Sequence, residues 1–449
     1  MPPLQSRITG YTLGVDKIEQ RAVAAPLIRG GVARECRKTK AEGINTQYYR
    51  QEDFLVRPFE GIKVIDLTHV LAGPFAAYQL AVLGAEVIKI ENPEDCDQSR
   101  NTGSNKELNR RDMGTSYLAQ GSNKRAITLN LKTDKGRAIL KQLVAGADVM
   151  VENYRAGAFE ALGLGYKDMQ KINPTLIYCS MTAFGQDGPR RTHTAYDHAV
   201  QATSGIMAMT GEKDGPPLKC GAPIIEYSTG TMAAFAIASA LFQRTRTGRG
   251  QHIDCAMADV AMMLEASHIT GYSSTGKAPG PHGNKHAYAS SYFYDTKDGQ
   301  IMLAASNHRQ NKRLFETLGQ PERGDADNET RAKNFKEDEA VLREIMRQKP
   351  AQEWEDHLQA HHVPALRMRT MPEALADPQV KTRKILHEHA SIPGVEGALT
   401  VPMCAFKLEH GGASIETPPP RLGEHNAEVL ERLGYSAAAI AALRSEGVI

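Results

Sequence analysis

The chain has 449 residues, which is long enough for two or three domains. Its 54 Lys and Arg nearly balance its 52 Asp and Glu, and we find no basic block interleaved with aromatic residues, so we expect no nucleic-acid partner. Its six cysteines lie far apart without any Cys-x-x-Cys pair, which argues against a zinc site and a disulfide framework and favours a reducing, cytoplasmic location.

The first 58 residues differ in composition from the rest of the chain. They are polar and only weakly periodic, so we expect an amino-terminal extension over 1–58 that packs on the surface or on a partner subunit. A targeting peptide is the alternative, but Asp16, Glu19 and Glu35 argue against the acid-poor composition of such peptides. No apolar run reaches the ~18 residues needed to cross a bilayer, so we predict no membrane-spanning segment and no membrane partner.

From Phe59 onwards, short apolar runs alternate with amphipathic segments. The apolar runs predict strands at 62–70, 85–91, 125–131, 148–154 and 176–184. Runs that are apolar along nearly their whole length are typical of strands buried on both faces of a parallel sheet. Apolar residues recur at helical spacing in three segments, which predicts helices at 73–84, 133–147 and 165–173. Thr133 is the expected N-cap of the second helix. This alternation predicts a doubly wound, Rossmann-like α/β domain.

The first strand-to-helix turn tests whether such a domain binds a dinucleotide. Its sequence, HVLAGPFAA, holds a single glycine, Gly73, followed by Pro74. The three-glycine fingerprint that lets a pyrophosphate approach the backbone is missing. A helix amino terminus can still receive an anion through its free N–H groups, so we expect an anion-binding turn rather than an NAD site.

Two acidic residues further along the chain are candidates for a site. Glu226 interrupts the small, apolar run GAPIIEYSTGTMAAFAIASAL, and a buried unpaired carboxylate costs several kcal/mol. It therefore lies either on a surface that the sequence hides or in a functional site. Asp197 in TAYDHAVQ is the second candidate, and it can equally be the N-cap of a helix that begins there.

Seven motifs follow one another along the chain: GIKVIDLTHVLAGPFAAYQLAVLGAEVIKIE, NKRAITLNLKTDKGR, DVMVENYRAGAFEALGLGY, SMTAFGQDGP, AYDHAVQATSGIMAMTG, RTGRGQHIDCAM and PRLGEHNAEVLERLG. Together they resemble the class III (CaiB/BaiF) coenzyme A transferases, the group of formyl-CoA and carnitine CoA transferases. The resemblance runs from about Gly61 to the carboxyl end. Racemases and isomerases of acyl-CoA thioesters share this fold, so the family is better supported than the reaction.

The resemblance implies an architecture in which both chain ends build one large domain and two chains interlock as a homodimer. The implied segments are a large CoA-binding domain at 59–257 and 395–449, linkers at 258–281 and 376–394, and a small domain at 282–375. Within the small domain, 292–305 predicts a hairpin and 336–362 predicts helices. The Gly-rich segment 268–290 suits a long connection that also carries function.

The family's nucleophile is an aspartate in GAPxxDxxTG, and that position is Glu226 here. A carboxylate of either length can attack a thioester carbonyl, and an ordinary glutamate is already ionised at neutral pH. Three interpretations remain open: Glu226 is the nucleophile, it transfers protons in an isomerase-like member, or it is a remnant in a member without turnover. Asp197 lies opposite the nucleophile in the family, and Tyr196 stands where racemases have a histidine, which argues against racemisation.

The family binds CoA on the large domain. When the family's binding positions are carried over to this sequence, the resemblance implies His69, Val70, Leu71 and Ala72 in the first turn, Leu129 beside the adenine, and Asn153, Tyr154 and Tyr196 along the cofactor. Lys124, Arg125 and Arg155 can supply charge for phosphates or can be solvated surface residues. Formyl-CoA transferases have glutamine at Leu71 and arginine at Asn92, so we expect a different substrate.

Gly283, in GPHGNKHAYAS, falls where the family has a mobile glycine loop over the reacting carboxylate, and it can equally be an ordinary turn with positive φ.

From the motifs and the two acidic residues together, we predict a CoA transferase that moves CoA between an acyl-CoA and a small organic or dicarboxylic acid, with no metal and no tightly bound cofactor. An acyl-CoA isomerase and a non-catalytic CoA-binding protein are the alternatives.

Overall fold

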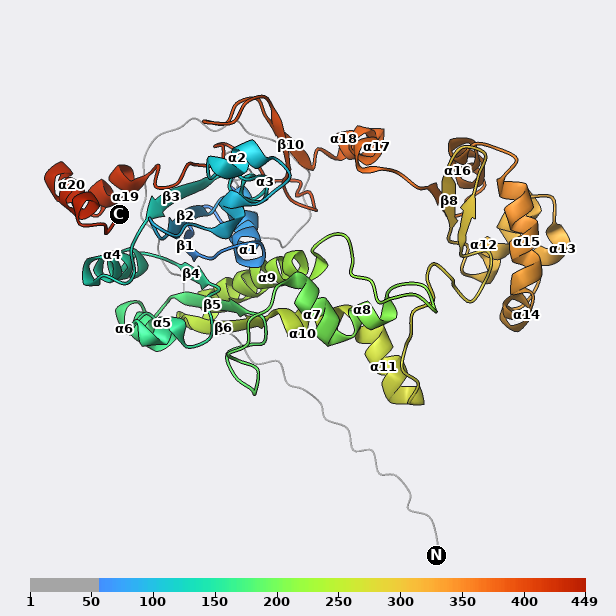
Figure 1. Cartoon of the computed structure of the whole chain (residues 1–449), viewed down its shortest axis with the longest axis horizontal. Coiled ribbons are helices and arrows are strands. Elements are labelled where there is room, and N and C mark those ends of the chain that lie inside the picture. The colour runs from blue at the N-terminus through green and yellow to red at the C-terminus, as the bar shows by residue number, and fades with distance from the viewer. Residues whose placement is uncertain (1–55) are drawn as a thin grey trace, which may run out of the picture. The chain divides into compact units, whose positions relative to one another are not determined.

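The structure, a computed structural model, describes residues 56–449, so nearly all of the predicted extension at 1–58 lies outside the described residues. Its main sheet has six parallel strands in the order β3-β2-β1-β4-β5-β6 (Figure 1). The strands are β1 (Lys63–Leu67), β2 (Glu86–Glu91), β3 (Lys124–Thr128), β4 (Val149–Glu152), β5 (Ile177–Thr182) and β6 (Gln251–Ala256). The five predicted strands are confirmed, and so is the Rossmann-like α/β class, since this strand order is that of the doubly wound dinucleotide-binding fold.

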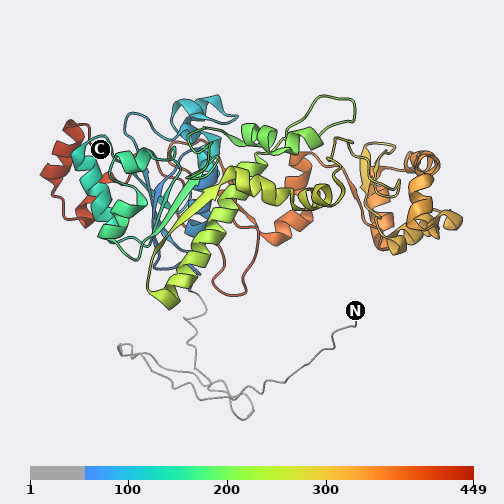
Figure 2. The same cartoon turned by 90° about the horizontal axis from the view of Figure 1, so that it is seen from below.

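Both faces of the sheet are covered by helices (Figure 2). One face packs α1 (Ala72–Val82) and α9 (Ile224–Thr247), which bury Val64, Val87 and Val151 of the strands. The other packs α4 (Asp134–Ala145), α6 (Tyr166–Ile172), α19 (Asn426–Arg432) and α20 (Ala437–Ser445). Successive strand residues point to opposite faces, so both sets must be apolar, which explains the continuous apolar runs. Thr133 caps α4 through Gly136 N–H, as predicted.

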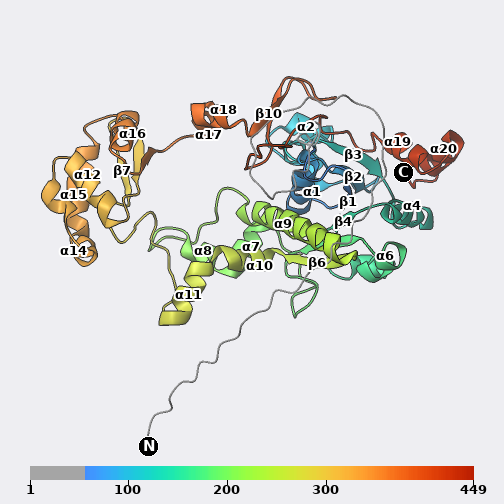
Figure 3. The same ribbon diagram turned by 180° about the vertical axis from the view of Figure 1, so that it is seen from behind.

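Helices α1 and α9 lie side by side on their face of the sheet (Figure 3). Their close approach depends on Gly230, because a Cβ at this position would lie 2.5 Å from the carbonyl oxygen of Ala72. Any side chain there would push the helices apart. The start of α1 is thereby held against the first turns of α9.

By length and composition α9 is able to cross a membrane, so the prediction that no segment is long and apolar enough is wrong for these 24 residues. Its packing is that of a core helix, since Ile225, Ala233 and Ile237 are fully buried within the fold. Phe235 and Phe242 on its other side are 67% and 60% exposed.

A separate hydrophobic core is made wholly from residues between Ala289 and Ala365. Its antiparallel sheet joins β7 (Phe293–Asp295), β8 (Gln300–Leu303) and β9 (Ala365–Arg367), which confirms the predicted hairpin. The helices around it are α12 (His308–Thr317), α13 (Pro321–Gly324), α14 (Asn328–Lys333), α15 (Phe335–Met346) and α16 (Ala351–Ala360). The last two confirm the predicted helices, and the exact domain boundaries remain a prediction.

The remaining elements lie in the segments between those already described. They are η2 (Gln98–Asn101), α2 (Lys106–Arg110), α3 (Thr115–Leu118), α5 (Ala158–Ala161), α7 (Asp197–Ser204), α8 (Ile206–Met209), α10 (Met257–Leu264), α11 (Ala266–Thr275), α17 (Met371–Ala376), α18 (Pro378–Arg383), β10 (Leu386–His389) and β11 (Leu399–Pro402). Much of the predicted linker at 258–281 is helical in α10 and α11, a difference from the expected Gly-rich connection.

Candidate active site

A cavity of about 670 Å³ opens at the carboxyl ends of the parallel strands. The strand order reverses between β1 and β4, and open α/β sheets bind their ligands at this point. Predicted site residues on its wall are His69, Val70, Ala72, Asn153, Tyr154, Tyr196 and Glu226. They come from the loops after β1, β4 and β5 and from the first turn of α9, so segments more than 150 residues apart converge.

Glu226 lies in the first turn of α9 and is 6% exposed. Its Oε2 accepts a hydrogen bond of 2.9 Å from Ala72 N–H, at the start of α1. Burial raises the pKa of Glu226 to about 7; the bond from Ala72 opposes this rise, and the Asp197 carboxylate adds to it. The expectation of an ordinary, fully ionised glutamate is therefore wrong, since this group titrates near neutral pH.

Asp197 lies behind Glu226 and is not among the residues of the cavity wall. Its Oδ2 accepts hydrogen bonds from Ile225 N–H (2.8 Å) and Glu226 N–H (3.0 Å), and Gln201 Nε2 donates to its Oδ1. A helix begins here as expected, but the N-cap interpretation of Asp197 is wrong: Tyr196 is the N-cap of α7, and the N–H groups that Asp197 satisfies belong to α9. It therefore fixes the first turn of α9, and with it the backbone that carries Glu226.

The loops after β1 and β4 are tied together at the cavity wall. His69 N–H donates to Asn153 Oδ1 and Asn153 Nδ2 donates to His69 O, each at 2.8 Å. His69 Nε2 also lies 2.8 Å from the Tyr154 hydroxyl. Burial lowers the pKa of His69, so its ring is neutral at physiological pH and serves as a hydrogen-bonding group.

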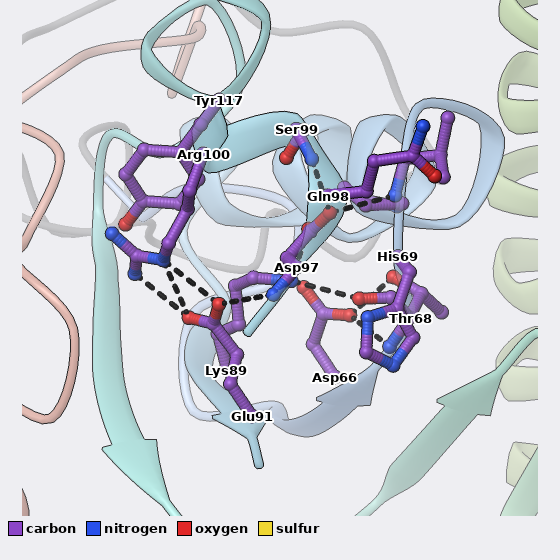
Figure 4. Close-up of polar contacts among 12 residues, drawn as sticks. Asp66, Thr68, His69, Lys89, Glu91, Asp97, Gln98, Ser99, Arg100 and Tyr117 are labelled. Carbon is purple, nitrogen blue, oxygen red and sulfur yellow. Dashed lines mark hydrogen bonds and ion pairs between the residues drawn. The ribbon is translucent and has the colours of Figure 1, made fainter. Parts of the chain in front are cut away.

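Val70 adopts φ +70°, a conformation that is strained for a β-branched residue. Its N–H donates to Asp97 Oδ1 (2.8 Å) and its carbonyl accepts from Gln120 Nε2 (2.7 Å). Asp97 is in turn paired with buried Lys89 at 2.8 Å, and Lys89 Nζ donates to Thr68 O (Figure 4). The strained turn is thus held at both sides by a buried polar network that the sequence analysis did not identify.

The three cations that the sequence left open as phosphate ligands or solvated surface residues lie in different places. Lys124 is buried in an ion pair of 2.9 Å with Asp66, and Arg125 pairs with Glu86 and Glu428. Neither lies on the cavity wall, whereas Arg155 does. The wall also carries Lys132 and Arg191, which sequence reasoning missed; Lys132 directly follows the third predicted strand, which is the signal that could have identified it.

A smaller cavity of about 120 Å³ adjoins the first and shares Asn92, Lys132 and Tyr154 with it. Leu129 lies on its otherwise largely apolar wall. Leu71 and Gly283 are on neither wall. Gly283 has φ +58° and its N–H donates to Gly211 O, so the structure shows a turn glycine there.

Among residues 56–449, no group of three or more His, Cys, Asp or Glu is arranged to hold a metal ion. The two cavities together present the Glu226 carboxylate at a helix amino terminus, the cations Lys132, Arg155 and Arg191, and the apolar recess beside Leu129. These are suited to covalent carboxylate chemistry on an anionic ligand with an apolar part.

Comparison with known proteins agrees with these features. The family model described as CoA-transferase family III matches residues 59–426. Human succinyl-CoA:glutarate CoA-transferase is 36% identical over 88% of this chain and 90% of its own length. Acetyl-CoA:oxalate CoA-transferase of Acetobacter aceti is 38% identical over 82% of this chain and 94% of its own.

Among solved structures, a CAIB/BAIF family protein from Brucella suis matches with a TM-score of 0.73 and 33% identity, over 84% of this chain and 99% of its own. Fold, cavity and sequence thus agree along most of the chain: it belongs to CoA-transferase family III and is a class III CoA-transferase.

Proposed function

We propose that the enzyme moves CoA between an acyl-CoA thioester and a free carboxylic acid, with Glu226 as the nucleophile. The observation that carries this proposal is the environment of the Glu226 carboxylate. It lies on the cavity wall, one oxygen is held by Ala72 N–H, and the other has no hydrogen-bond partner among residues 56–449. An oxygen without a partner is available to attack.

The reaction proceeds through four acyl transfers. The free Oε1 of Glu226 attacks the thioester carbonyl carbon, the C–S bond breaks, and a mixed anhydride and CoA thiolate form. The thiolate attacks the Glu226 carbonyl carbon and expels the donor acid as a carboxylate that carries Oε1, leaving a glutamyl-CoA thioester. The acceptor carboxylate attacks that thioester and releases the thiolate, which then attacks the acceptor's acyl carbon and regenerates Glu226. Each step conserves charge, and none needs a metal or a redox group.

Small dicarboxylic acids are the substrates that we favour. Relatives bear names that include succinyl-CoA, glutarate, mesaconate and oxalate. Arg191 on the cavity wall is available to a second carboxylate, and arginine suits bidentate carboxylate recognition.

For CoA, the recess beside Leu129 suits the adenine, and Lys132 and Arg155 suit its phosphates. The pantetheine arm of CoA then extends toward Glu226 and contacts His69, Val70, Ala72, Asn153, Tyr154 and Tyr196. CoA acts here as a substrate, with no tightly bound cofactor. We propose Gly283 as a lid residue on the family resemblance alone.

We also propose an interlocked homodimer in the cytoplasm. An apolar surface on α9, α10 and α11 supports a protein partner, since exposed patches of this kind mark interfaces. Its residues are Met232, Phe235, Phe242, Met262, Met263, Leu264, Ile269 and Tyr272.

A panel of acyl-CoA donors and carboxylic acid acceptors, analysed by mass for CoA exchange, tests the function. Exchange by the wild type and its loss in Glu226→Gln, with CoA binding retained, is the expected result. An isomerase would convert one thioester without any acceptor acid, and a binding protein would turn over nothing. Either result would overturn the proposal.

A further inference from the structure

Thr229 is a second polar residue of α9 on the cavity wall, three residues after Glu226. It is fully buried, and its hydroxyl oxygen has no hydrogen-bond partner among residues 56–449. Buried hydroxyl groups are nearly always paired, and a threonine in a helix usually bonds the carbonyl one turn back. An unpaired one at a reactive carboxylate requires an explanation.

The helix geometry brings this hydroxyl toward Glu226. Residues three apart on a helix are neighbours, with Cβ atoms about 5–6 Å apart, and helical side chains lean toward the amino terminus. Thr229 therefore leans over the turn that carries Glu226. Ala72 N–H approaches the same carboxylate from α1, and Gly230 permits that close approach.

We propose that the Thr229 hydroxyl is the second donor of an oxyanion hole for the Glu226 carbonyl, with Ala72 N–H as the first. This inference rests on the proposed function. When the CoA thiolate attacks the anhydride, the C–S bond forms and the π pair moves onto Oε2, which Ala72 N–H already holds. Collapse of this tetrahedral oxyanion breaks the bond to Oε1 and releases the donor carboxylate. The same oxyanion forms again when the acceptor acid resolves the glutamyl thioester.

In the resting enzyme Thr229 makes no hydrogen bond to the Glu226 carboxylate, so on this proposal the hydroxyl meets Oε2 only when that oxygen moves as the carbonyl carbon becomes tetrahedral. A donor that finds its partner only in the transition state lowers the barrier without tightening ground-state binding. Thr229 should therefore affect kcat and leave KM nearly unchanged.

The test compares Thr229→Val, which keeps the shape and removes the hydroxyl, with Thr229→Ser, which keeps the hydroxyl. We expect Thr229→Val to lower kcat and the rate of glutamyl-CoA formation, followed by intact-protein mass in a single turnover, about 100-fold or more, as loss of one such donor does elsewhere. Thr229→Ser should stay within about fivefold of the wild type. Thermal unfolding should show Tm for Thr229→Val no lower than for the wild type, because the variant removes an unsatisfied hydroxyl.

Three results would overturn the inference while leaving the proposed function intact. One is a Thr229→Val rate within about threefold of the wild type, another is equal loss in the Val and Ser variants, and the third is a lower Tm together with the lower rate. If instead the wild type exchanges no acid, or Glu226→Gln remains active, the proposed function falls and the inference falls with it.

Discussion

At the scale of single residues, Glu226 combines two opposing effects. Burial raises its pKa to about 7, and the hydrogen bond from Ala72 stabilises its ionised form. A carboxylate with a raised pKa is more basic and hence a better nucleophile once ionised. Burial thus increases the reactivity of the ionised form and lowers its fraction at neutral pH.

The raised pKa predicts a pH profile. Only ionised Glu226 attacks, so kcat/KM should fall about tenfold per pH unit well below pH 7 and level off above it. Initial rates at low substrate concentration between pH 5.5 and 8.5 provide the measurement. Buried Glu152 also has its pKa raised by burial to about 7, so Glu152→Gln is the control and should keep the same profile. A profile that is flat across this range would contradict the raised pKa of Glu226.

The length of the Glu226 side chain predicts the effect of Glu226→Asp. Aspartate would withdraw the carboxylate by one methylene from both Ala72 N–H and the substrate, and a misplacement of ~1 Å can cost ~100-fold. We expect kcat to fall by about this factor, measured as exchange with the preferred donor and acceptor. A gain of activity would show instead that the glutamate is poorly matched to its site.

At the scale of elements, the strained turn after β1 depends on buried charges on its neighbours. Lys89 on β2 and Asp97 before η2 form an ion pair in which both side chains are almost fully buried. Burial alone would raise the pKa of Asp97, but Lys89 and the N–H groups of Val70 and Ser99 lower it below its usual range. The pair therefore stays ionised at working pH and holds Val70 in its left-handed conformation.

Asp97→Asn tests this support. The amide keeps the shape but removes the carboxylate that is ion-paired with buried Lys89, so the free energy of unfolding should fall by roughly 3–5 kcal/mol in urea titrations. The control is Glu107→Gln, because Glu107 pairs with Arg110 and Arg111 on the exposed surface, where water and salt screen the charges, so the free energy of unfolding should hardly change. Equal effects of the two substitutions would contradict a supporting role for the buried pair.

The sequence predicted the elements that have a clear apolar pattern. Five strands of the main sheet follow from runs that must be apolar on both faces. The sixth, β6, is an edge strand whose residues 251–254 are only partly buried or exposed, so it lacks that pattern. Helix α11 was missed because its residues, ASHITGYSST, are poor helix formers and none of them is buried.

The site was predictable where a single motif carries it, as at Glu226. Lys89 and Arg100 look like surface cations in the sequence, yet both are buried beside carboxylates. Likewise, the bond from Glu226 N–H to Asp197 joins residues 29 apart, and no local pattern reports it. Contacts of this kind depend on how the elements pack.

At the scale of the whole molecule, the exposed aromatic residues of α9 predict assembly. We expect the wild type to remain dimeric at low nanomolar concentration in sedimentation or mass photometry, since an interlocked pair cannot separate without partial unfolding. Phe235→Glu should lower the yield of dimer. Met371→Glu, at an equally exposed methionine on α17, should not. A wild-type monomer that appears on simple dilution would contradict interlocking.

The two last helices also determine when the fold can be completed. Asn426 at the start of α19 binds Thr128 of β3 from 298 residues away, and α19 and α20 cover the sheet face beside α4. While the ribosome is still making the intervening residues, the part of this apolar face that α19 and α20 cover stays exposed beside α4 and α6. At typical elongation rates of 5–20 residues per second, the wait is roughly 15–60 s. The large core therefore closes only late in synthesis, and the nascent chain needs protection from aggregation during that interval.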